Sequence, residues 1–163
     1  MWVLIFSELA VFGAGLAAFM GVRLTDPAGF AQARSHLMVE LAGTNTIILV
    51  TSGLFAALAV TAKTRRVARV WLAAASLLGL VFLGLKTVEY TAKAAAGINF
   101  ETHEFFTFYY LLTGFHAAHL IAGVIILALV GWQAQHRAIQ TGAAFWHMVD
   151  LVWVLLFPVI YLL

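Results

Sequence analysis

The sequence predicts an all-α membrane protein, a bundle of five transmembrane helices with the N-terminus in the cytoplasm and the C-terminus outside. Hydrophobic residues make up 64% of the 163-residue chain and charged residues only 10%. The mean hydropathy is +1.01, far above that of soluble globular domains. Five apolar stretches of membrane-spanning length and one basic connector complete the evidence for this fold class.

A helix needs roughly 20 apolar residues to cross a hydrocarbon core of about 30 Å. The chain contains five such stretches joined by short connectors, so we expect a single transmembrane domain over residues 1–163. The first stretch lacks a basic leading region and carries Glu8 within its apolar run, so we predict a permanent helix and not a cleaved signal peptide. The expected helices cover residues 2–22, 40–62, 70–92, 105–132 and 144–163.

Basic residues set the expected orientation, because connectors rich in lysine and arginine stay in the cytoplasm. The second and fourth connectors carry five of them against three in the outer connectors, which gives a cytoplasmic N-terminus. The inner residues are Lys63, Arg65, Arg66, Arg69 and Arg137, and the outer residues are Arg23, Arg34 and Lys93. The net charge of +2 gives no indication of a nucleic-acid partner, and the absence of cysteine excludes disulfides and thiolate metal sites.

Small residues spaced by four mark surfaces where membrane helices pack closely. The first helix carries the series Gly13, Ala17 and Gly21, beside a second series of Ala10, Ala14 and Ala18. We expect Gly114 and Gly123 to pack in the same way in the fourth helix. In the second helix, Asn45 and Ser52 share one face, which we expect to point into protein.

Seven ionisable residues lie inside the predicted spans, where each costs about 2.5–3.5 kcal/mol at the membrane centre. Six of them form pairs three residues apart, so the members of each pair share a helix face. The pairs are Lys86 with Glu89, His116 with His119, and His147 with Asp150, and Glu8 stands alone in the first helix.

We expect an intramembrane polar cluster of Glu8, His116, His119, His147 and Asp150, in which Glu8, Asp150, His147 and His119 form one continuous string. Two roles remain open: buried polar residues that fix the helix order, or proton handling and ligand binding. Lys86 and Glu89 lie towards the outer end of their helix, where we expect an outer polar pair that reaches the membrane surface.

No catalytic, cofactor-binding or metal-binding residues are predicted. His116 and His119 lie on one turn and cannot both be axial ligands of one haem; pairing either with His147 is the weaker alternative of a haem-bearing anchor. The Glu-x-x-His pattern of carboxylate-bridged di-metal centres is missing.

Four segments resemble subunit III of the haem-copper oxidase superfamily. Residues 108–123, FYYLLTGFHAAHLIAG, are similar to its TGFH-x-x-H-x-x-x-G helix, and residues 145–153, FWHMVDLVW, to its YWHFVD-x-x-W segment. Residues 6–12, FSELAVF, resemble its SE-x-x-F-F element, and residues 41–53, LAGTNTIILVTSG, its L-x-x-N-T-x-x-L-x-x-S-S segment. The order along the chain is also the family's, so the resemblance covers essentially the whole sequence.

Within the superfamily the chain resembles a five-helix member. The segments KTVEY (residues 86–90) and FFTFYY (105–110) are most similar to the NorE-type accessory subunit of nitric oxide reductases, where oxidases more usually have glutamine at the Lys86 position. The resemblance implies a subunit without its own redox cofactor, which packs beside a haem-bearing catalytic subunit and binds phospholipid. It also implies that Glu8 is the family's intramembrane glutamate, which supports proton uptake or the stability of the complex.

We therefore expect a non-catalytic accessory subunit in a bacterial inner membrane, with a nitric oxide reductase as the preferred partner and haem in that partner. The alternatives are subunit III of a cytochrome or quinol oxidase and, less favoured, an autonomous proton or small-solute carrier.

Overall fold

The computed structural model describes residues 2–133 and 135–163, and it contains five helices long and apolar enough to cross a membrane. They are α1 (Trp2–Arg23), α3 (Val39–Thr61), α4 (Arg65–Ala95), α5 (Glu104–Gln133) and α6 (His136–Phe157). A short helix, α2 (Pro27–Arg34), follows α1, and a π-helical turn, η1 (Pro158–Leu162), extends α6. The predicted fold class of five membrane-spanning helices is therefore confirmed for the described part of the chain.

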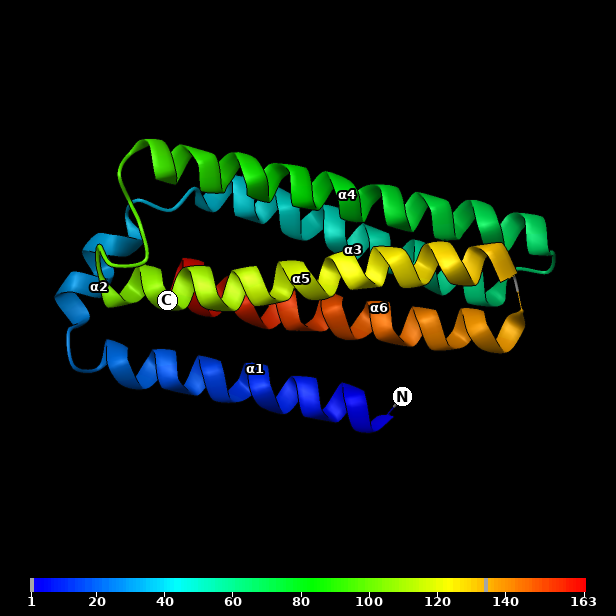
Figure 1. Cartoon of the computed structure of the whole chain (residues 1–163), viewed down its shortest axis with the longest axis horizontal. Helices are drawn as coiled ribbons and strands as arrows, with labels where there is room; N and C mark the ends of the chain where they lie inside the picture. The colour runs from blue at the N-terminus through cyan, green and yellow to red at the C-terminus, as the bar shows by residue number, and fades with distance from the viewer. Residues whose placement is uncertain (1, 134) are drawn as a thin grey trace.

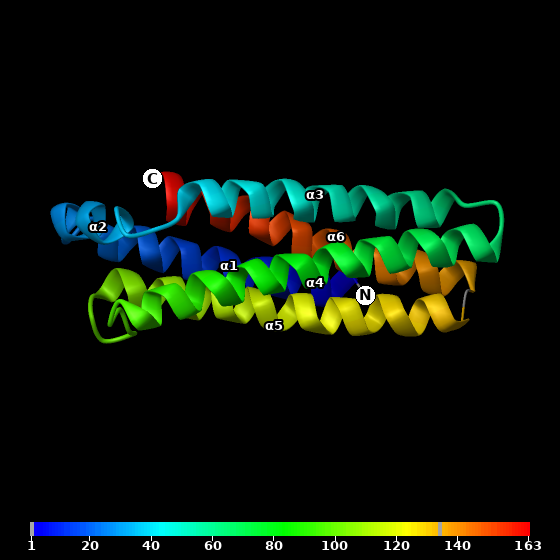
Figure 2. The same cartoon turned by 90° about the horizontal axis from the view of Figure 1, so that it is seen from above.

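The long helices form a layered bundle (Figures 1 and 2). α3 packs against α4 and α6, and α5 packs against the same two helices, so these four close a ring. α1 lies outside this ring against α5 and α6. The C-terminus lies towards the end of the bundle that carries α2. α1 begins on the side where α3 connects to α4 and runs towards α2 (Figure 1).

Helix ends differ from the predicted ones where charged turns extend beyond the apolar core. α4 begins at Arg65, five residues earlier than expected, because the Thr64 side chain caps its first turn by accepting a hydrogen bond from the Val67 N–H at 3.3 Å. It ends three residues later than expected, where Gly97 adopts a φ of 73°, a conformation that suits glycine after a helix. α6 begins eight residues earlier than expected, at His136.

α3 carries a polar face, and this face points into protein as predicted. Asn45 and Ser52 are buried. The Asn45 amide donates to the Phe82 carbonyl at 3.2 Å, and the Ser52 hydroxyl donates to the Ala75 carbonyl at 2.8 Å. Ser52 in turn accepts a bond from the Trp146 indole at 3.0 Å. These bonds join α3, α4 and α6 where no water competes for them.

Candidate functional site

The intramembrane polar residues separate into three groups in the structure. Glu8 pairs with His119 between α1 and α5, and His147 pairs with Asp150 on α6. Lys86 and Glu89 join a third group inside the bundle. The structure places the members of the expected string of Glu8, Asp150, His147 and His119 in two separate pairs: Glu8 with His119 at the α1–α5 boundary, and His147 with Asp150 against α3.

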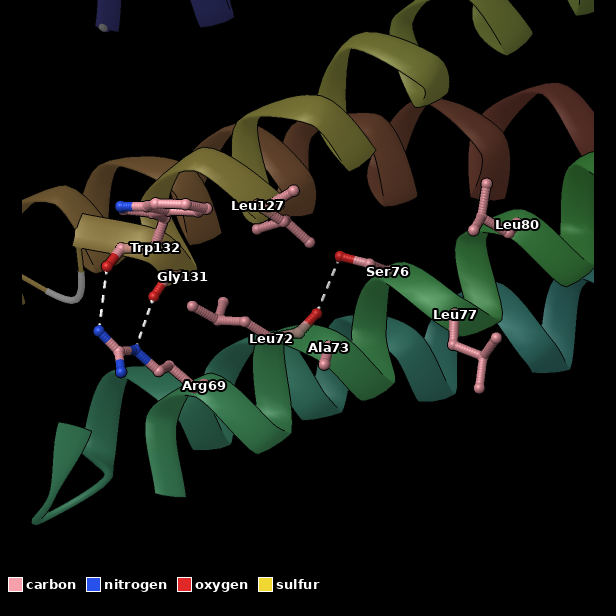
Figure 3. A pocket seen from close by; sticks show the side chains of 10 residues that line it. Arg69, Leu72, Ala73, Ser76, Leu77, Leu80, Leu127, Gly131 and Trp132 are labelled. Carbon is pink, nitrogen blue, oxygen red and sulfur yellow. Dashed lines mark hydrogen bonds between the residues drawn. The ribbon is translucent and has the colours of Figure 1, made fainter. Parts of the chain in front are cut away.

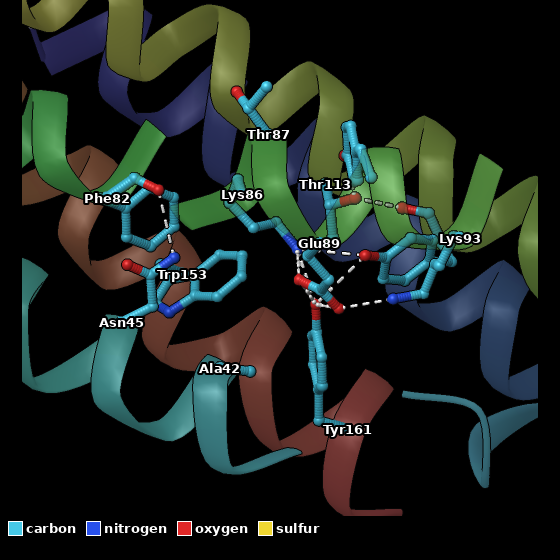
Figure 4. Close-up of polar contacts among 12 residues, drawn as sticks. Ala42, Asn45, Phe82, Lys86, Thr87, Glu89, Lys93, Thr113, Trp153 and Tyr161 are labelled. Carbon is cyan, nitrogen blue, oxygen red and sulfur yellow. Dashed lines mark hydrogen bonds and ion pairs between the residues drawn. The ribbon is translucent and has the colours of Figure 1, made fainter. Parts of the chain in front are cut away.

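Lys86 and Glu89 form the centre of a buried group that we call the lysine cluster, together with Lys93, Tyr109 and Tyr161. The three charged members of the cluster, all on α4, are 1–4% exposed. Lys86 Nζ donates to Glu89 Oε2 at 2.8 Å, and Lys93 Nζ donates to Glu89 Oε1 at 2.8 Å. Figure 4 shows Glu89 between the two lysines. The expected surface-reaching pair was wrong, because these side chains point into the bundle.

Two tyrosine hydroxyls complete the lysine cluster. Lys86 Nζ donates to the Tyr161 hydroxyl at 2.6 Å and to the Tyr109 hydroxyl at 3.3 Å, so all three of its N–H groups have acceptors. Tyr161 donates to the Glu89 carboxyl, at 3.0 and 3.1 Å from its two oxygens. The rings of Tyr109 and Trp153 also face Lys86 Nζ at 5.0 and 5.2 Å, and such cation–π contacts contribute about 2 kcal/mol when desolvated.

Sequence reasoning missed three members of this cluster. Lys93 was counted among the outer connector residues, but it lies in the last turn of α4 and is buried. Its position four residues after Glu89 was an available signal, because such pairs meet on a helix face. Tyr109 and Tyr161 gave no such signal, since their partners lie 23 and 75 residues away along the chain.

Glu8 and His119 form the first of two pairs that lie near the surface of the protein, which we call the surface-near pairs. Glu8 Oε2 lies 3.0 Å from His119 Nε2, and the side chains are 22% and 17% exposed. The other ring nitrogen of His119 lies 2.9 Å from the Phe115 carbonyl, which fixes the ring orientation. Phe12 packs edge-on against the imidazole, 5.7 Å between ring centres. The pair can share a proton between a carboxyl and an imidazole at the α1–α5 boundary.

His147 and Asp150 form the second pair, on the side of α6 that faces α3. His147 Nδ1 lies 3.8 Å from Asp150 Oδ2, and the His147 side chain is 45% exposed. The Asp150 carboxyl sits over the α3 backbone at Gly53, where an added Cβ would collide with it. Both residues line a groove of about 420 Å³ whose other walls are apolar side chains of α3 and α6.

His116 takes no part in either pair. It is 1% exposed, and neither ring nitrogen has a hydrogen-bond partner among the described residues. Its ring lies between aromatic side chains, 5.2 Å from Trp153 and 5.8 Å from Phe82 between ring centres. The described residues contain no group of three or more histidine, aspartate or glutamate side chains placed to hold a metal ion.

The expected packing glycines take two kinds of position. Gly123 lies against Trp146, and an added Cβ would come within 2.8 Å of the indole. At Gly114 the nearest atom, the Tyr90 hydroxyl oxygen, would be 4.0 Å away. Gly13, Ala17 and Gly21 lie on the exposed face of α1, and an added Cβ at either glycine meets nothing within 4 Å.

Comparison with known proteins matches residues 1–163 to the family model described as cytochrome c oxidase subunit III. A cytochrome c oxidase subunit 3 of Corynebacterium diphtheriae is 31% identical over 98% of this chain and 84% of its own length. A probable quinol oxidase subunit 3 of Staphylococcus aureus is 24% identical over 99% of this chain and 86% of its own length. A heme-copper oxidase subunit I+III of Aeropyrum pernix is 31% identical over 99% of this chain, which covers 22% of that longer protein.

These relatives carry oxidase names, so they support the oxidase alternative better than the preferred nitric oxide reductase. Subunit III of haem-copper oxidases is a non-catalytic partner of the catalytic subunit I and does not itself bind haem. The match spans every helix and both of the surface-near pairs described above. The chain belongs to the cytochrome c oxidase subunit III family of multi-pass membrane proteins.

Proposed function

We propose that this chain is a non-catalytic accessory subunit of a haem-copper terminal oxidase in a bacterial inner membrane. It packs laterally against a haem-bearing catalytic subunit and stabilises or tunes that subunit, with cytochrome c or quinol as the electron donor of the complex. The observation that carries this proposal is the fused relative, in which one protein is named for both subunits I and III and nearly all of this chain is matched. Two subunits joined in one polypeptide are held next to each other, so the fusion supports lateral packing of this chain against a catalytic subunit.

A nitric oxide reductase remains a second candidate partner because of one residue. Lys86 occupies a position where the resemblance gives oxidases glutamine more often, and here it is the centre of the buried lysine cluster. The two partners are distinguished by deleting the chain in its native host. The oxidase proposal expects slower oxygen uptake by the membranes; unchanged oxygen uptake with slower nitric oxide consumption would favour the reductase.

Glu8 is the residue through which we propose that the subunit acts on the complex. Its 3.0 Å contact with His119 supports either a local proton store or a structural tie between α1 and α5. The variant Glu8→Gln removes the charge and keeps the shape. We expect the isolated chain to fold and the assembled complex to lose turnover or inactivate several-fold faster, measured as oxygen uptake over time.

The matched control is Glu40→Gln, which changes an exposed carboxyl in the first turn of α3. Equal inactivation rates for Glu8→Gln and the wild-type complex would remove Glu8 from the functional residues.

Phospholipid binding forms part of the proposal, and a groove of about 680 Å³ between α4 and α5 supports it (Figure 3). Arg69 lies at one end and donates to the Gly131 and Trp132 carbonyls, both at 3.0 Å, which uses two of its five N–H groups. From Arg69 to Leu80 the groove follows α4 for roughly 16 Å at 1.5 Å per residue. That is about half of a 30 Å hydrocarbon core, the depth of one acyl chain.

A cytoplasmic N-terminus completes the proposal. With Lys93 buried in the lysine cluster, the outer connectors keep only Arg23 and Arg34, while the inner ones keep all five basic residues. The difference in basic residues between the two sides therefore grows from two to three, which supports the orientation.

The deciding experiment is purification of the chain from its native membrane in mild detergent, followed by an absorption spectrum and mass spectrometry. A haem-containing catalytic subunit should accompany the chain in stoichiometric amount. Recovery of the chain without any haem-containing partner would contradict the proposal and favour the autonomous carrier. A stoichiometric Soret band in the chain purified alone would favour the haem-bearing anchor.

A further inference from the structure

The membrane-facing groove between α3 and α6 has a feature that the other faces lack. His147 is 45% exposed there, at the middle of a membrane-spanning helix. It lies eleven residues after His136, the first residue of α6, or roughly 16 Å along the helix at 1.5 Å per residue. An imidazole is too short to reach the membrane surface from that depth, in contrast to a lysine or arginine side chain.

Apart from Asp150, the residues that line the groove around His147 are apolar. The rim of the groove consists of apolar side chains, of which Leu54 is 56% exposed and Leu151 is 48% exposed. Behind the imidazole, Asp150 is 8% exposed, and its Oδ1 has no hydrogen-bond partner among the described residues. Acyl chains offer neither donors nor acceptors, so a lipid in this groove would leave the exposed imidazole of His147 without a hydrogen-bond partner on its outer side.

We propose that the α3–α6 groove around His147 and Asp150 is the docking surface for a transmembrane helix of the haem-bearing catalytic subunit. The partner helix places a polar, hydrogen-bonding side chain against the imidazole and the carboxyl, with small or apolar residues on either side. Gly53 gives the groove its floor, since any larger residue would occupy the space of the Asp150 carboxyl. This inference rests on the proposed function and adds the face at which the two subunits meet.

The other exposed faces fit this partner less well. The α4–α5 groove is lined mainly by apolar residues, and its one mid-groove hydroxyl, Ser76, donates to the Leu72 carbonyl of its own helix. The charged residue of its lining, Arg69, lies at one end, as a phospholipid with a terminal phosphate requires (Figure 3). At the α1–α5 boundary, Glu8 and His119 lie 3.0 Å apart and their side chains are 22% and 17% exposed, so less of this pair faces the membrane than of His147, which is 45% exposed. The α3–α6 groove is the surface where mid-membrane polarity needs a protein to cover it.

Photo-cross-linking in the native membrane tests this assignment. We would introduce p-benzoylphenylalanine at Leu151 or Leu54 on the groove rim, with Leu77 on α4, 61% exposed, as the matched control. Irradiation should join the haem-bearing subunit to the chain from positions 151 and 54 and not from position 77. The docking surface would be contradicted if the haem-bearing subunit were cross-linked from position 77 and not from positions 151 and 54. It would also be contradicted if position 151 were cross-linked to lipid or to a second copy of the chain and not to the haem-bearing subunit.

The proposed function is tested separately, by measuring in the same preparation, before irradiation, whether a haem-containing subunit co-purifies with the chain. A haem-containing subunit that co-purifies without cross-linking from the groove leaves the proposed function standing and removes this docking surface. Absence of any such subunit contradicts the proposed function itself.

The variant His147→Leu gives a second, independent test because its two expected effects differ in size. The imidazole is 45% exposed and lies 3.8 Å from Asp150 Oδ2, at the long end of an ion pair, so replacing it should change the thermal stability of the isolated chain only slightly. If the imidazole bonds to a partner helix, the same change should lower recovery of the haem-bearing subunit about three- to tenfold. Unchanged recovery would count against the docking surface whatever the stability of the isolated chain.

Discussion

The lysine cluster and the His147–Asp150 pair have the same local pattern and opposite surroundings. Both join an acidic and a basic side chain three residues apart on one helix. In the lysine cluster every donor of Lys86 has an acceptor and the charged residues are at most 4% exposed. In the second pair the histidine faces outward and one carboxyl oxygen has no described partner. The buried lysine cluster stabilises contacts within the bundle, whereas the exposed histidine of the second pair is accessible to another protein.

The largest expected loss of stability comes from disrupting the lysine cluster. Glu89→Gln removes the carboxylate that two buried lysines share, and losing one partner of a buried pair costs about 3–5 kcal/mol. We expect that loss in the free energy of unfolding, measured by denaturant titration in detergent. Glu104→Gln, at an exposed first-turn position of α5, is the control. A loss below about 1 kcal/mol for Glu89→Gln would show that the cluster contributes little to stability.

A smaller loss is expected where a rigid side chain fills the space beside a glycine. Gly123→Ala places a Cβ 2.8 Å from Trp146, which is fully buried, and overpacking of this kind costs about 1–3 kcal/mol. The same titration should show the loss. Gly13→Ala, where the added Cβ meets nothing within 4 Å, should be neutral. Equal stability of the two variants would mean that α5 and α6 separate easily at Trp146.

The His147–Asp150 pair should respond more weakly when a neighbouring glycine is replaced by alanine. Gly53→Ala drives a Cβ into the Asp150 carboxyl, but that carboxyl ends a flexible side chain beside an open groove and can rotate away. We expect the isolated chain to lose less than about 1 kcal/mol, because one staggered rotamer replaces another. A loss as large as that of Gly123→Ala would show that the carboxyl is fixed as firmly as the buried indole.

The smallest effect is expected for the acid–base pair outside the membrane. Asp26 accepts a hydrogen bond from the Gly29 N–H at 3.0 Å and lies 3.2 Å from His103, and both contacts lower its pKa below the ordinary value of 3.8. A lowered folded-state pKa stabilises the fold above that ordinary value and loses its contribution as the pH falls through the folded pKa. Thermal unfolding should therefore separate wild type from Asp26→Asn at pH 7, and the gap should close as the pH falls through the lowered pKa of Asp26, below 3.8.

Asparagine also caps helices well, so this substitution tests the charge and not the cap. A gap that stays constant from pH 7 down to the lowest pH at which the chain remains folded would mean that the charge of Asp26 contributes nothing.

The sequence was sufficient for the features that depend on distance along one helix. Five apolar runs of spanning length gave the five helices, and the spacing of Asn45 and Ser52 gave a face that is buried as predicted. α2 escaped prediction because eight residues of mixed polarity between two spans produce no apolar run. Its start is nonetheless encoded locally, by Asp26 as cap and Pro27 as first residue.

The polar groups were harder to predict because their contacts depend on rotation about each helix axis and on the choice of neighbours. Depth alone allowed Glu8 and Asp150 to meet, but Glu8 turns towards α5 and Asp150 towards α3. Depth also suggested that Lys86 reaches the surface, but Tyr109 and Tyr161 bring hydroxyls to it from α5 and η1. Such partners lie far along the chain, and no spacing rule identifies them.

The π-helical turn at the end of α6 has a consequence for biosynthesis. Lys86, Glu89 and Lys93 can pair within α4 as soon as that helix enters the membrane, which lowers the cost of inserting three ionisable groups together. The hydroxyl of Tyr161, which contacts both Lys86 and Glu89, is added more than sixty residues later, in the turn that Arg34 also holds through the Leu162 carbonyl at 2.6 Å. The interior of the bundle is therefore completed only after the last turn has been synthesised and inserted.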